Sequence, residues 1–307
     1  MTKWTTNDIP DLTGRSAVVT GTGGIGFETA SALAAAGAEV IVAGRNPASG
    51  EKAVERIHAR TPGADVAFER VDLADLSTVA AFGDRLRRSR DSLHVLINNA
   101  AVMAPPDKRL TSDGFELQFG TNFLGHFALT AQLLPLLRKA EGARVVSLGS
   151  LAANGGAIDF QNLNAERAYQ PMAIYSQSKL ACILFAFELQ RRSDWAGWGI
   201  DSIAAHPGIS RSDLIPNSAG RWEFSRLLRT GLPFLFQPVA QGALPSLYAA
   251  TSPDARPGAY YGPDRLAETR GHPAPAKVVD QAKDAAVAGR LWNEAERLTG
   301  LSFDQAA

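Results

Sequence analysis

The sequence predicts an α/β fold, in which a single domain is built on a doubly wound parallel sheet with helices on both faces. Two observations predict it. Short apolar and β-branched runs alternate with helical patterns along most of the chain, as is typical of parallel sheets. The first strand also leads directly into a glycine-rich turn that opens a helix. No Ser/Gly-rich linker divides the chain, so we expect residues 1–307 to form one domain.

The first strand, turn and helix form a nucleotide-binding pattern. Residues 16–20 are β-rich, and residues 27–36 read as an Ala-rich helix closed by Gly37. The turn between them, from Gly21 to Gly26, fits G-x-G-x-x-G, which allows a tight turn and a close approach of the backbone to a pyrophosphate at the helix N-terminus. The turn residues expected to contact the cofactor are Gly21, Thr22, Gly23, Gly24 and Ile25.

The second strand indicates which cofactor binds. Residues 39–44 form a strand that is apolar after Glu39, and Arg45 and Asn46 follow it. An Asp or Glu in this region would favour the free ribose hydroxyl of NAD, whereas an Arg suits a 2′-phosphate. The sequence therefore predicts that NADP(H) is preferred, with NAD(H) as the alternative cofactor. Arg45 could instead be a solvated surface residue.

The alternation continues with helices at 47–60 and 75–88 and strands at 65–71 and 93–97. Ligands of such sheets bind at the carboxyl ends of the strands. Asp72-Leu73 and Asn98-Asn99-Ala100 follow two of these strands and include polar groups that could contact an adenosine. The expected contacts are Asp72, Leu73, Asn98 and Ala100. Alternatively, the Asp caps the next helix and the Asn pair holds its loop together.

The next elements carry the residues that could do chemistry. A helix from Phe115 onward contains Asn122, a weak helix former among apolar neighbours, which requires a hydrogen-bonding reason to be there. The strand at 143–148 leads to Ser150 at its carboxyl end. A helix over 173–189 then carries Tyr175 and Lys179, four residues apart on one face, so that an ammonium can act on a phenol and lower its pKa.

Composition excludes several classes. The 31 basic and 31 acidic residues give zero net charge, so no nucleic-acid partner is expected. The longest apolar run, 180–187, is too short to span a bilayer, and the N-terminus lacks a signal peptide, so we expect a cytoplasmic protein with no membrane span. Cys182 is the single cysteine and no His pair has ligand spacing, so no metal site is expected.

Taken in order, these motifs resemble those of the short-chain dehydrogenase/reductase family from about Leu12 to Pro263. The resemblance is closest to the subgroup of retinol dehydrogenases and WW-domain-containing oxidoreductases, and it implies a Rossmann fold. Two departures are visible: the glycine turn is one residue shorter than the usual T-G-x-x-x-G-x-G, and Ala101 replaces a usual glycine. The matching motifs are the glycine turn, Asp72, Asn98-Asn99-Ala100, Asn122-x-x-Gly125-His126-Phe127, Ser150-Leu151-Ala152, Tyr175-x-x-x-Lys179 and His206-Pro207-Gly208-x-x-Arg211-Ser212.

The resemblance implies roles for individual residues. Tyr175 would exchange the proton on the substrate oxygen, and Ser150 would hold that oxygen by a hydrogen bond. Lys179 would bind the nicotinamide ribose and, with the oxidised ring, lower the pKa of Tyr175. Asn122 would anchor a water in a proton relay. The residues implied on the carboxamide side of the nicotinamide are Pro207, Gly208, Ile209 and Ser212.

The motifs above do not specify the substrate or the oligomeric state, for which the rest of the sequence gives less direct signals. A predicted lid over about 210–238 is rich in Trp, Phe and Leu, which indicates a lipophilic substrate, although the same residues would suit helix packing or a partner-facing surface. A helix over 238–250, a strand over 259–262 and a helical tail over 277–298 complete the chain. Family members commonly form homodimers or homotetramers through the helices that here carry Asn122 and Tyr175.

The sequence thus predicts an oxidoreductase that transfers a hydride between NADP(H) and a lipophilic alcohol, aldehyde or ketone. A second enzymatic interpretation is a ketoreductase acting on a polyketide or steroid-like ring in a biosynthetic pathway. A third hypothesis, from another class, is a sensor that binds NADP without turnover. The complete set of Asn122, Ser150, Tyr175 and Lys179 favours an enzyme, because binding alone would not require all four.

Overall fold

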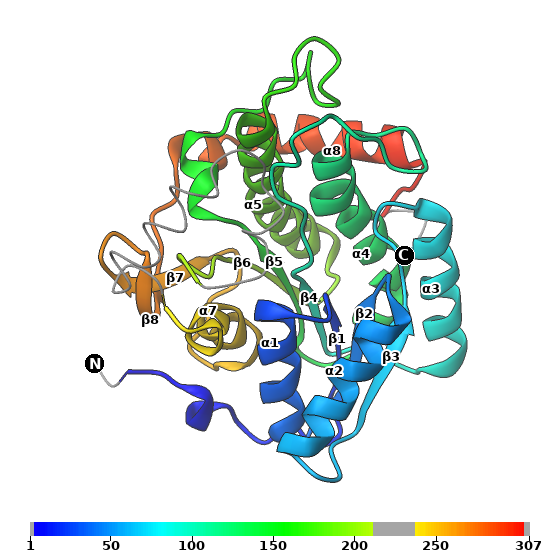
Figure 1. Cartoon of the computed structure of the whole chain (residues 1–307), viewed down its shortest axis with the longest axis vertical. Coiled ribbons are helices and arrows are strands. Elements are labelled where there is room, and N and C mark those ends of the chain that lie inside the picture. Colours follow the sequence, from blue (N-terminus) through cyan, green and yellow to red (C-terminus); the bar gives the residue numbers. More distant parts are fainter. Residues whose placement is uncertain (1–2, 211–236, 304–307) are drawn as a thin grey trace.

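The computed structural model describes residues 3–210 and 237–303, and these residues form one eight-stranded sheet (Figure 1). The strand order is β3-β2-β1-β4-β5-β6-β7-β8. All neighbours pair in parallel except β7 and β8, which form an antiparallel hairpin at the edge. The strands are β1 (Ser16–Thr20), β2 (Glu39–Gly44), β3 (Val66–Arg70), β4 (Val95–Asn98), β5 (Ala143–Leu148), β6 (Ile200–Ala205), β7 (Tyr260–Arg265) and β8 (Arg270–Pro275).

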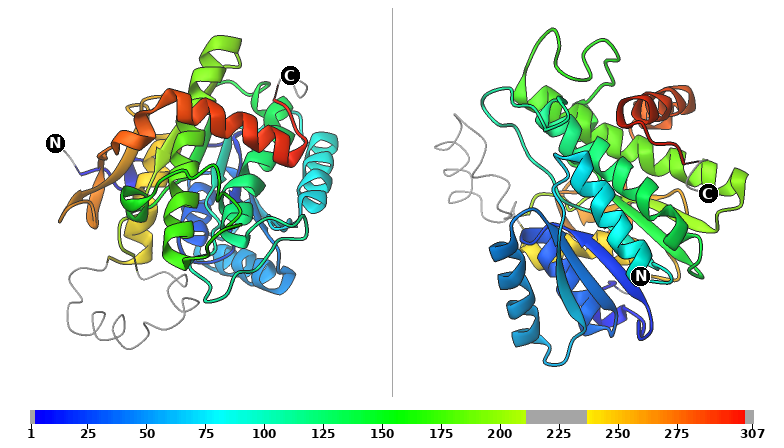
Figure 2. Two further views of the ribbon diagram at one scale, coloured as in Figure 1. Left: turned by 90° about the horizontal axis from the view of Figure 1, so that it is seen from above. Right: turned by 90° about the vertical axis from the view of Figure 1, so that its right-hand side faces the viewer.

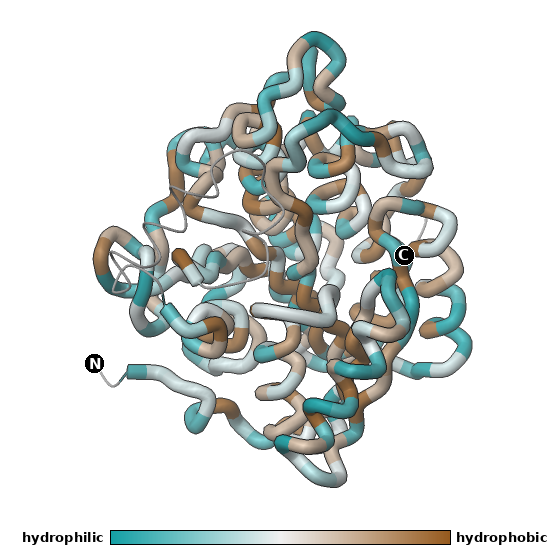
Figure 3. The backbone as a smooth tube through the Cα atoms, in the orientation of Figure 1, coloured by the Kyte–Doolittle hydropathy of each residue, from teal (hydrophilic) through white to brown (hydrophobic). Residues whose placement is uncertain are grey.

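Helices cover both faces of the sheet, which confirms the predicted fold class. One buried cluster joins the sheet to α1, α2 and α7, and the other joins it to α3, α4, α5 and α8 (Figure 2). Strands with two covered faces are largely apolar, while hydrophilic residues gather on the outer loops (Figure 3). The helices are α1 (Gly24–Ala35), α2 (Pro47–Arg60), α3 (Leu76–Ser89), the π-helical turn η2 (Phe119–Leu124), α4 (Gly125–Leu137), α5 (Pro171–Ala196), α7 (Val239–Thr251) and α8 (Ala285–Thr299), with short 3-10 turns at Thr6–Asp8, Leu151–Gly155 and Asp280–Lys283.

Two elements of the C-terminal third differ from the expectation. The strand predicted over 259–262 extends to Arg265 and turns back as β8, which the sequence analysis did not predict because Gly271 and two prolines give it little strand propensity. The predicted tail helix begins at Ala285 rather than at 277. Asp284 caps this start by accepting hydrogen bonds from two backbone N–H groups. The predicted lid lies almost entirely outside the described residues.

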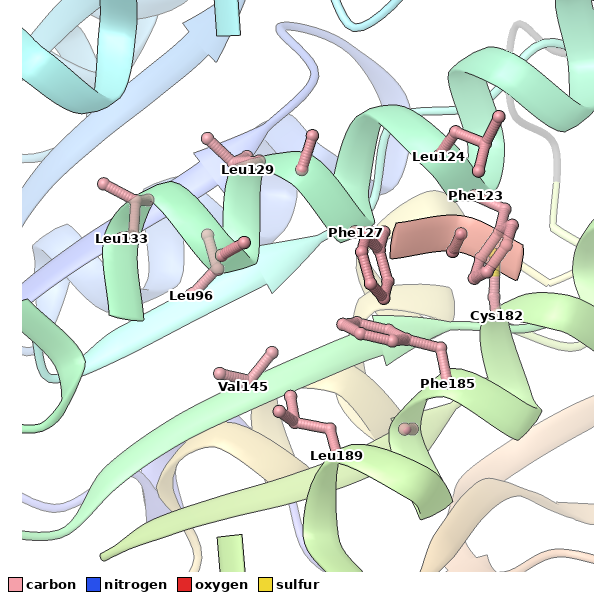
Figure 4. Packing of buried hydrophobic residues seen from close by; sticks show 14 of the residues in the cluster. Leu96, Phe123, Leu124, Phe127, Leu129, Leu133, Val145, Cys182, Phe185 and Leu189 are labelled. Carbon is pink, nitrogen blue, oxygen red and sulfur yellow. The ribbon is translucent and has the colours of Figure 1, made fainter. Parts of the chain in front are cut away.

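Helix α8 packs on the outer side of α4 and α5 through an aromatic cluster. Phe127 from α4 and Phe185 from α5 face each other (Figure 4), and the ring of Trp292 from α8 lies 5.1 Å and 5.7 Å from theirs, centroid to centroid. Phe303 closes the cluster 4.4 Å from Trp292. Helix α8 therefore packs chiefly on α5 and reaches α4 at Phe127, while the expected homodimer or homotetramer stays a prediction.

We expect Trp292→Ala to lower the free energy of unfolding by about 3–5 kcal/mol, because Trp292 is 2% exposed and its loss leaves a cavity among aromatic rings. Urea denaturation followed by circular dichroism measures this. Trp195→Ala is the matched control, since that indole is 87% exposed and should cost almost nothing. Equal effects of the two substitutions would contradict this account of α8.

Helix α5 is the central helix of the fold. Its 26 residues are long and apolar enough to cross a membrane by length and composition, which the shorter run at 180–187 did not reveal. In the structure, 78% of its most apolar window is buried among the other elements, as in the core helix of a soluble protein. Tyr175 and Lys179 belong to this buried part of the helix.

Candidate active site

Two adjoining cavities lie at the carboxyl ends of the parallel strands. The larger has a volume of about 530 Å³ and the smaller about 330 Å³, and both reach Gly21, Ala100 and Ala101. They meet where the strand order reverses between β1 and β4, the usual ligand position in such sheets. The larger cavity is also lined by Gly23, Gly24, Ile25, Asn99, Met103, Leu148, Gly149, Ser150, Leu151, Ala152, Tyr175, Lys179, Pro207, Gly208, Ile209 and Ser210.

The glycine turn has the geometry of a phosphate cradle. Gly21 has φ +101° and Gly24 φ +52°, in the region that favours glycine. A Cβ on Gly26 would lie 2.5 Å from the carbonyl oxygen of Gly21, so only glycine lets the helix start this close to the turn. No side chain caps α1 at Gly23, which leaves its first N–H groups and positive dipole directed at the larger cavity. The residues present therefore fit the pyrophosphate of a dinucleotide.

The smaller cavity collects the residues predicted to meet the adenosine half of the cofactor. It is lined by Thr22, Arg45, Asn46, Asp72, Leu73 and Ala100, together with Ala43, Gly44, Ser49, Val71, Val102 and Thr121. Arg45 is exposed, and no ion pair to it is found among the described residues. The oxygen Oδ1 of Asn46 caps α2 by accepting from the N–H of Ser49 at 3.1 Å. Ser49 and Thr121 were not predicted as contacts, and their hydroxyls are additional polar groups in this cavity.

Asn98 does not lie where the sequence analysis placed it. Its side chain is 3% exposed and donates to Oγ1 of Thr130 at 3.1 Å inside the fold, so it lines neither cavity. The neighbouring Asn99 lines the larger cavity instead and donates to the carbonyl of Thr20 at 2.6 Å. The prediction of Asn98 as a cofactor contact is corrected on this point, because successive residues of a strand end face opposite sides.

Tyr175 and Ser150 meet at the wall of the larger cavity. Tyr175 is 5% exposed, and burial raises its pKa to about 12, while a hydrogen bond with Ser150 acts in the opposite direction. Ser150 begins the turn Leu151–Gly155, accepting from the N–H of Ala152 at 3.2 Å. Its hydroxyl is thus fixed by local structure. In the protein alone the phenol is therefore protonated at neutral pH and can act as a proton donor.

Lys179 lines the same cavity one helical turn from Tyr175. It is 4% exposed, and its Nζ donates to the carbonyl of Leu148 at 2.9 Å. Burial lowers the pKa of Lys179. In the protein alone, burial raises the pKa of Tyr175 and the hydrogen bond with Ser150 opposes this, while the lowering expected from the Lys179 ammonium is not among the causes of the shift. Two of the three ammonium protons remain for groups in the cavity.

Asn122 is fully buried in the π-helical turn and lines neither cavity. Its amide exchanges two hydrogen bonds with the backbone of Val102 at 2.8 and 2.9 Å and donates to Oγ of Ser178 at 3.0 Å. Its backbone carbonyl accepts from Nδ1 of His126 at 2.9 Å and from the thiol of Cys182 at 3.2 Å. These bonds explain why an Asn stands inside a helix. They tie α5 to the segment after β4, while the water relay implied for Asn122 stays a prediction.

The loop after β6 forms the opposite wall. Pro207, Gly208 and Ile209 all line the larger cavity, where the resemblance placed them. Ser212, the fourth residue implied on the carboxamide side, lies outside the described residues. The structure thus brings the glycine turn, Ser150, Tyr175, Lys179 and this loop around one space, although they come from distant parts of the chain.

Comparisons with known proteins agree with this geometry. The family profile described as short chain dehydrogenase matches residues 15–220. Retinol dehydrogenase 12 of Mus musculus is 38% identical over 296 residues, covering 95% of this chain and 89% of that protein. Polyprenol dehydrogenase of Mus musculus is 39% identical over 302 residues, covering 95% and 86%. The crystal structure of an uncharacterised protein from Mycobacterium paratuberculosis superposes with a TM-score of 0.81 at 40% identity, covering 98% of this chain and 99% of that one. The chain therefore belongs to the short-chain dehydrogenase family and is an NAD(P)-dependent oxidoreductase.

Proposed function

We propose that this enzyme transfers a hydride between NADP(H) and a lipophilic alcohol, aldehyde or ketone, with Tyr175 as the acid and base. The observation that carries the proposal is the meeting of Ser150, Tyr175 and Lys179 in one cavity with an uncapped helix N-terminus. When bound, the nicotinamide cofactor supplies the hydride for reduction or accepts it in oxidation. The residues described above would hold its pyrophosphate at the glycine turn and its adenosine in the smaller cavity.

The protein's own part is to bind the substrate oxygen and move one proton. In the direction of reduction, the Tyr175 O–H donates its proton to the oxygen as negative charge develops there. The Ser150 hydroxyl, fixed at the start of its 3-10 turn, donates a second hydrogen bond to that oxygen. The buried ammonium of Lys179 stabilises the phenolate that remains. In oxidation the same groups act in reverse, with the phenolate accepting the alcohol proton.

The lining of the larger cavity supports a lipophilic substrate. Among the residues that the structure describes, Lys179 and Tyr175 are the only ionisable side chains that line it, and Met103, Leu151 and Ile209 contribute apolar surface. A charged substrate would find no counter-ion among these described residues beyond the ammonium. The relatives that carry the names retinol dehydrogenase and polyprenol dehydrogenase are named for lipophilic alcohols. This agreement extends the proposal to uncharged, largely apolar substrates.

The test is the absorbance of reduced nicotinamide with purified protein and a panel of lipophilic aldehydes and ketones. Oxidation of NADPH by retinal-like or long-chain aldehydes would support the proposal. Turnover confined to polycyclic or polyketide-like ketones would favour the ketoreductase interpretation. Cofactor binding without turnover of any compound in the panel would favour a sensor and contradict the proposed activity.

Arg45 should decide the preference for NADPH. We expect Arg45→Asp to reduce the ratio of kcat/KM for NADPH over NADH by about tenfold or more, because the guanidinium is replaced by a carboxylate that repels the 2′-phosphate. Lys52→Asp on the exposed side of α2 makes the same charge change away from both cavities and is the control. A ratio that falls equally in both variants, or in neither, would show that Arg45 does not contact the phosphate.

A further inference from the structure

The loop from Pro207 to Ile209 after β6, called the cavity loop below, is held by the edge hairpin that β7 and β8 form. The N–H of Ile209 donates to the carbonyl of Thr269 at 2.7 Å. Gly208 has φ +63°, and a Cβ on it would overlap the same carbonyl, so the loop and the hairpin turn touch backbone to backbone. On its other side, Gln237 donates to the carbonyl of Pro207 at 2.6 Å. The position of this wall of the cavity therefore depends on the hairpin.

His206 and Glu268 connect the same two segments through side chains. The N–H of Gly208 donates to Nδ1 of His206 at 3.3 Å, so the other ring nitrogen, Nε2, carries the proton. That nitrogen lies 3.1 Å from Oε2 of Glu268 and donates to it. The second carboxylate oxygen accepts from the backbone N–H of Lys277 at 2.7 Å. His206 is fully buried and fits only because Gly262 on β7 has no side chain.

The turn between β7 and β8, which carries Glu268, has an unusual left-handed backbone conformation. Three successive residues other than glycine, Leu266, Ala267 and Glu268, have φ of +49°, +52° and +63°. L-amino acids rarely adopt this region, and such a run persists only where surrounding contacts enforce it. Here the N–H and the hydroxyl of Thr269 donate to the carbonyl of Leu266 at 3.2 and 2.8 Å, and the Glu268 carboxylate and the Thr269 carbonyl bond to His206 and Ile209.

We propose that His206 and Glu268 are positioning residues that fix the loop from Pro207 to Ile209 against the nicotinamide end of the cofactor. The inference rests on the proposed function, because it presumes a nicotinamide in the larger cavity. Burial lowers the pKa of His206 to about 4, so at neutral pH the ring is neutral and keeps one donor and one acceptor. Neither side chain lines the cavity, which is why they act through the loop.

The experiment compares a whole cofactor with its adenosine half. We expect Glu268→Ala to raise the Kd for NADPH about tenfold while leaving the Kd for adenosine 2′,5′-bisphosphate within about twofold, because the fragment has no nicotinamide end. Both constants are measured by isothermal titration calorimetry. Leu266→Ala is the matched control, since this exposed side chain shares the turn and its left-handed conformation but lines neither cavity.

Each result has a distinct meaning. Equal weakening of both ligands in Glu268→Ala would indicate a general structural defect and overturn the inference, as would no change in either. Binding of neither NADPH nor NADH by the parent protein would overturn the proposed function together with the inference. A double-mutant cycle with His206→Gln adds a second measure: if the pair acts as one unit, the double variant loses no more NADPH affinity than the worse single variant.

Discussion

Replacing Tyr175 by Phe should lower kcat about 10³-fold and leave the Kd for the cofactor nearly unchanged. The substitution removes the proton donor of the reacting oxygen and the hydrogen bond with Ser150, but it keeps the ring that packs in the cavity wall. Because burial raises the pKa of Tyr175 to about 12, the phenol is protonated across the neutral range. Stopped-flow measurement of NADPH oxidation in a single turnover separates this chemical step from binding.

The same pKa predicts how each direction depends on pH. Reduction uses the protonated phenol, so its kcat/KM should be level from pH ~6 to ~9 and fall only as the phenol ionises. Oxidation uses the phenolate, so its rate should rise with pH over the same interval. A bound oxidised nicotinamide adds positive charge and would shift this rise to lower pH. Tyr175→Phe should abolish the rise.

Tyr169→Phe is the matched control for the loss of a phenol. Burial raises the pKa of Tyr169 to about 12 as well, and its hydroxyl donates to the carbonyl of Pro105 at 2.7 Å, outside both cavities. Its removal should leave kcat within about twofold. A Tyr175→Phe enzyme that reduces its carbonyl substrate as fast as the parent would refute the role assigned to this phenol.

Much of the site could be predicted because its parts are encoded locally. The glycine turn, the strand before it and the helix after it are contiguous, and the spacing of Tyr175 and Lys179 fixes their shared helix face. The order of strands and helices then determines that all these parts meet at one edge of a parallel sheet. These are properties that a single sequence displays directly.

The remaining parts depend on contacts that no local pattern contains. Asn98 and Asn99 are adjacent and chemically identical, and only the alternation of sides at the end of β4 decides which of them faces the cavity. Glu268 meets His206 across 62 residues, through a hairpin whose second strand has little strand propensity. Such pairings are set by the tertiary fold, which overrides local preference.

Replacing Lys179 by Met should lower kcat/KM about 10²-fold, the second-largest effect we expect. Met retains the apolar stem of the side chain, so packing in α5 is largely kept while the ammonium is lost. Two consequences should appear together. The Kd for NADPH should rise because a donor at the cavity is gone, and oxidation should require higher pH because nothing fixed offsets the charge of the phenolate.

Lys108→Met provides the control, because Lys108 also donates to a backbone carbonyl, that of Ala165 at 2.8 Å, but lines neither cavity. Lys179→Arg separates charge from shape: a guanidinium keeps the charge, yet its planar fork does not fit the buried position beside Leu148. If the ammonium acts on the phenol, the alkaline shift in the pH profile of oxidation should be larger in the Lys179→Met variant than in the Lys179→Arg variant. A pH profile unchanged in Lys179→Met would mean that Lys179 only binds cofactor and that burial alone governs the titration of Tyr175.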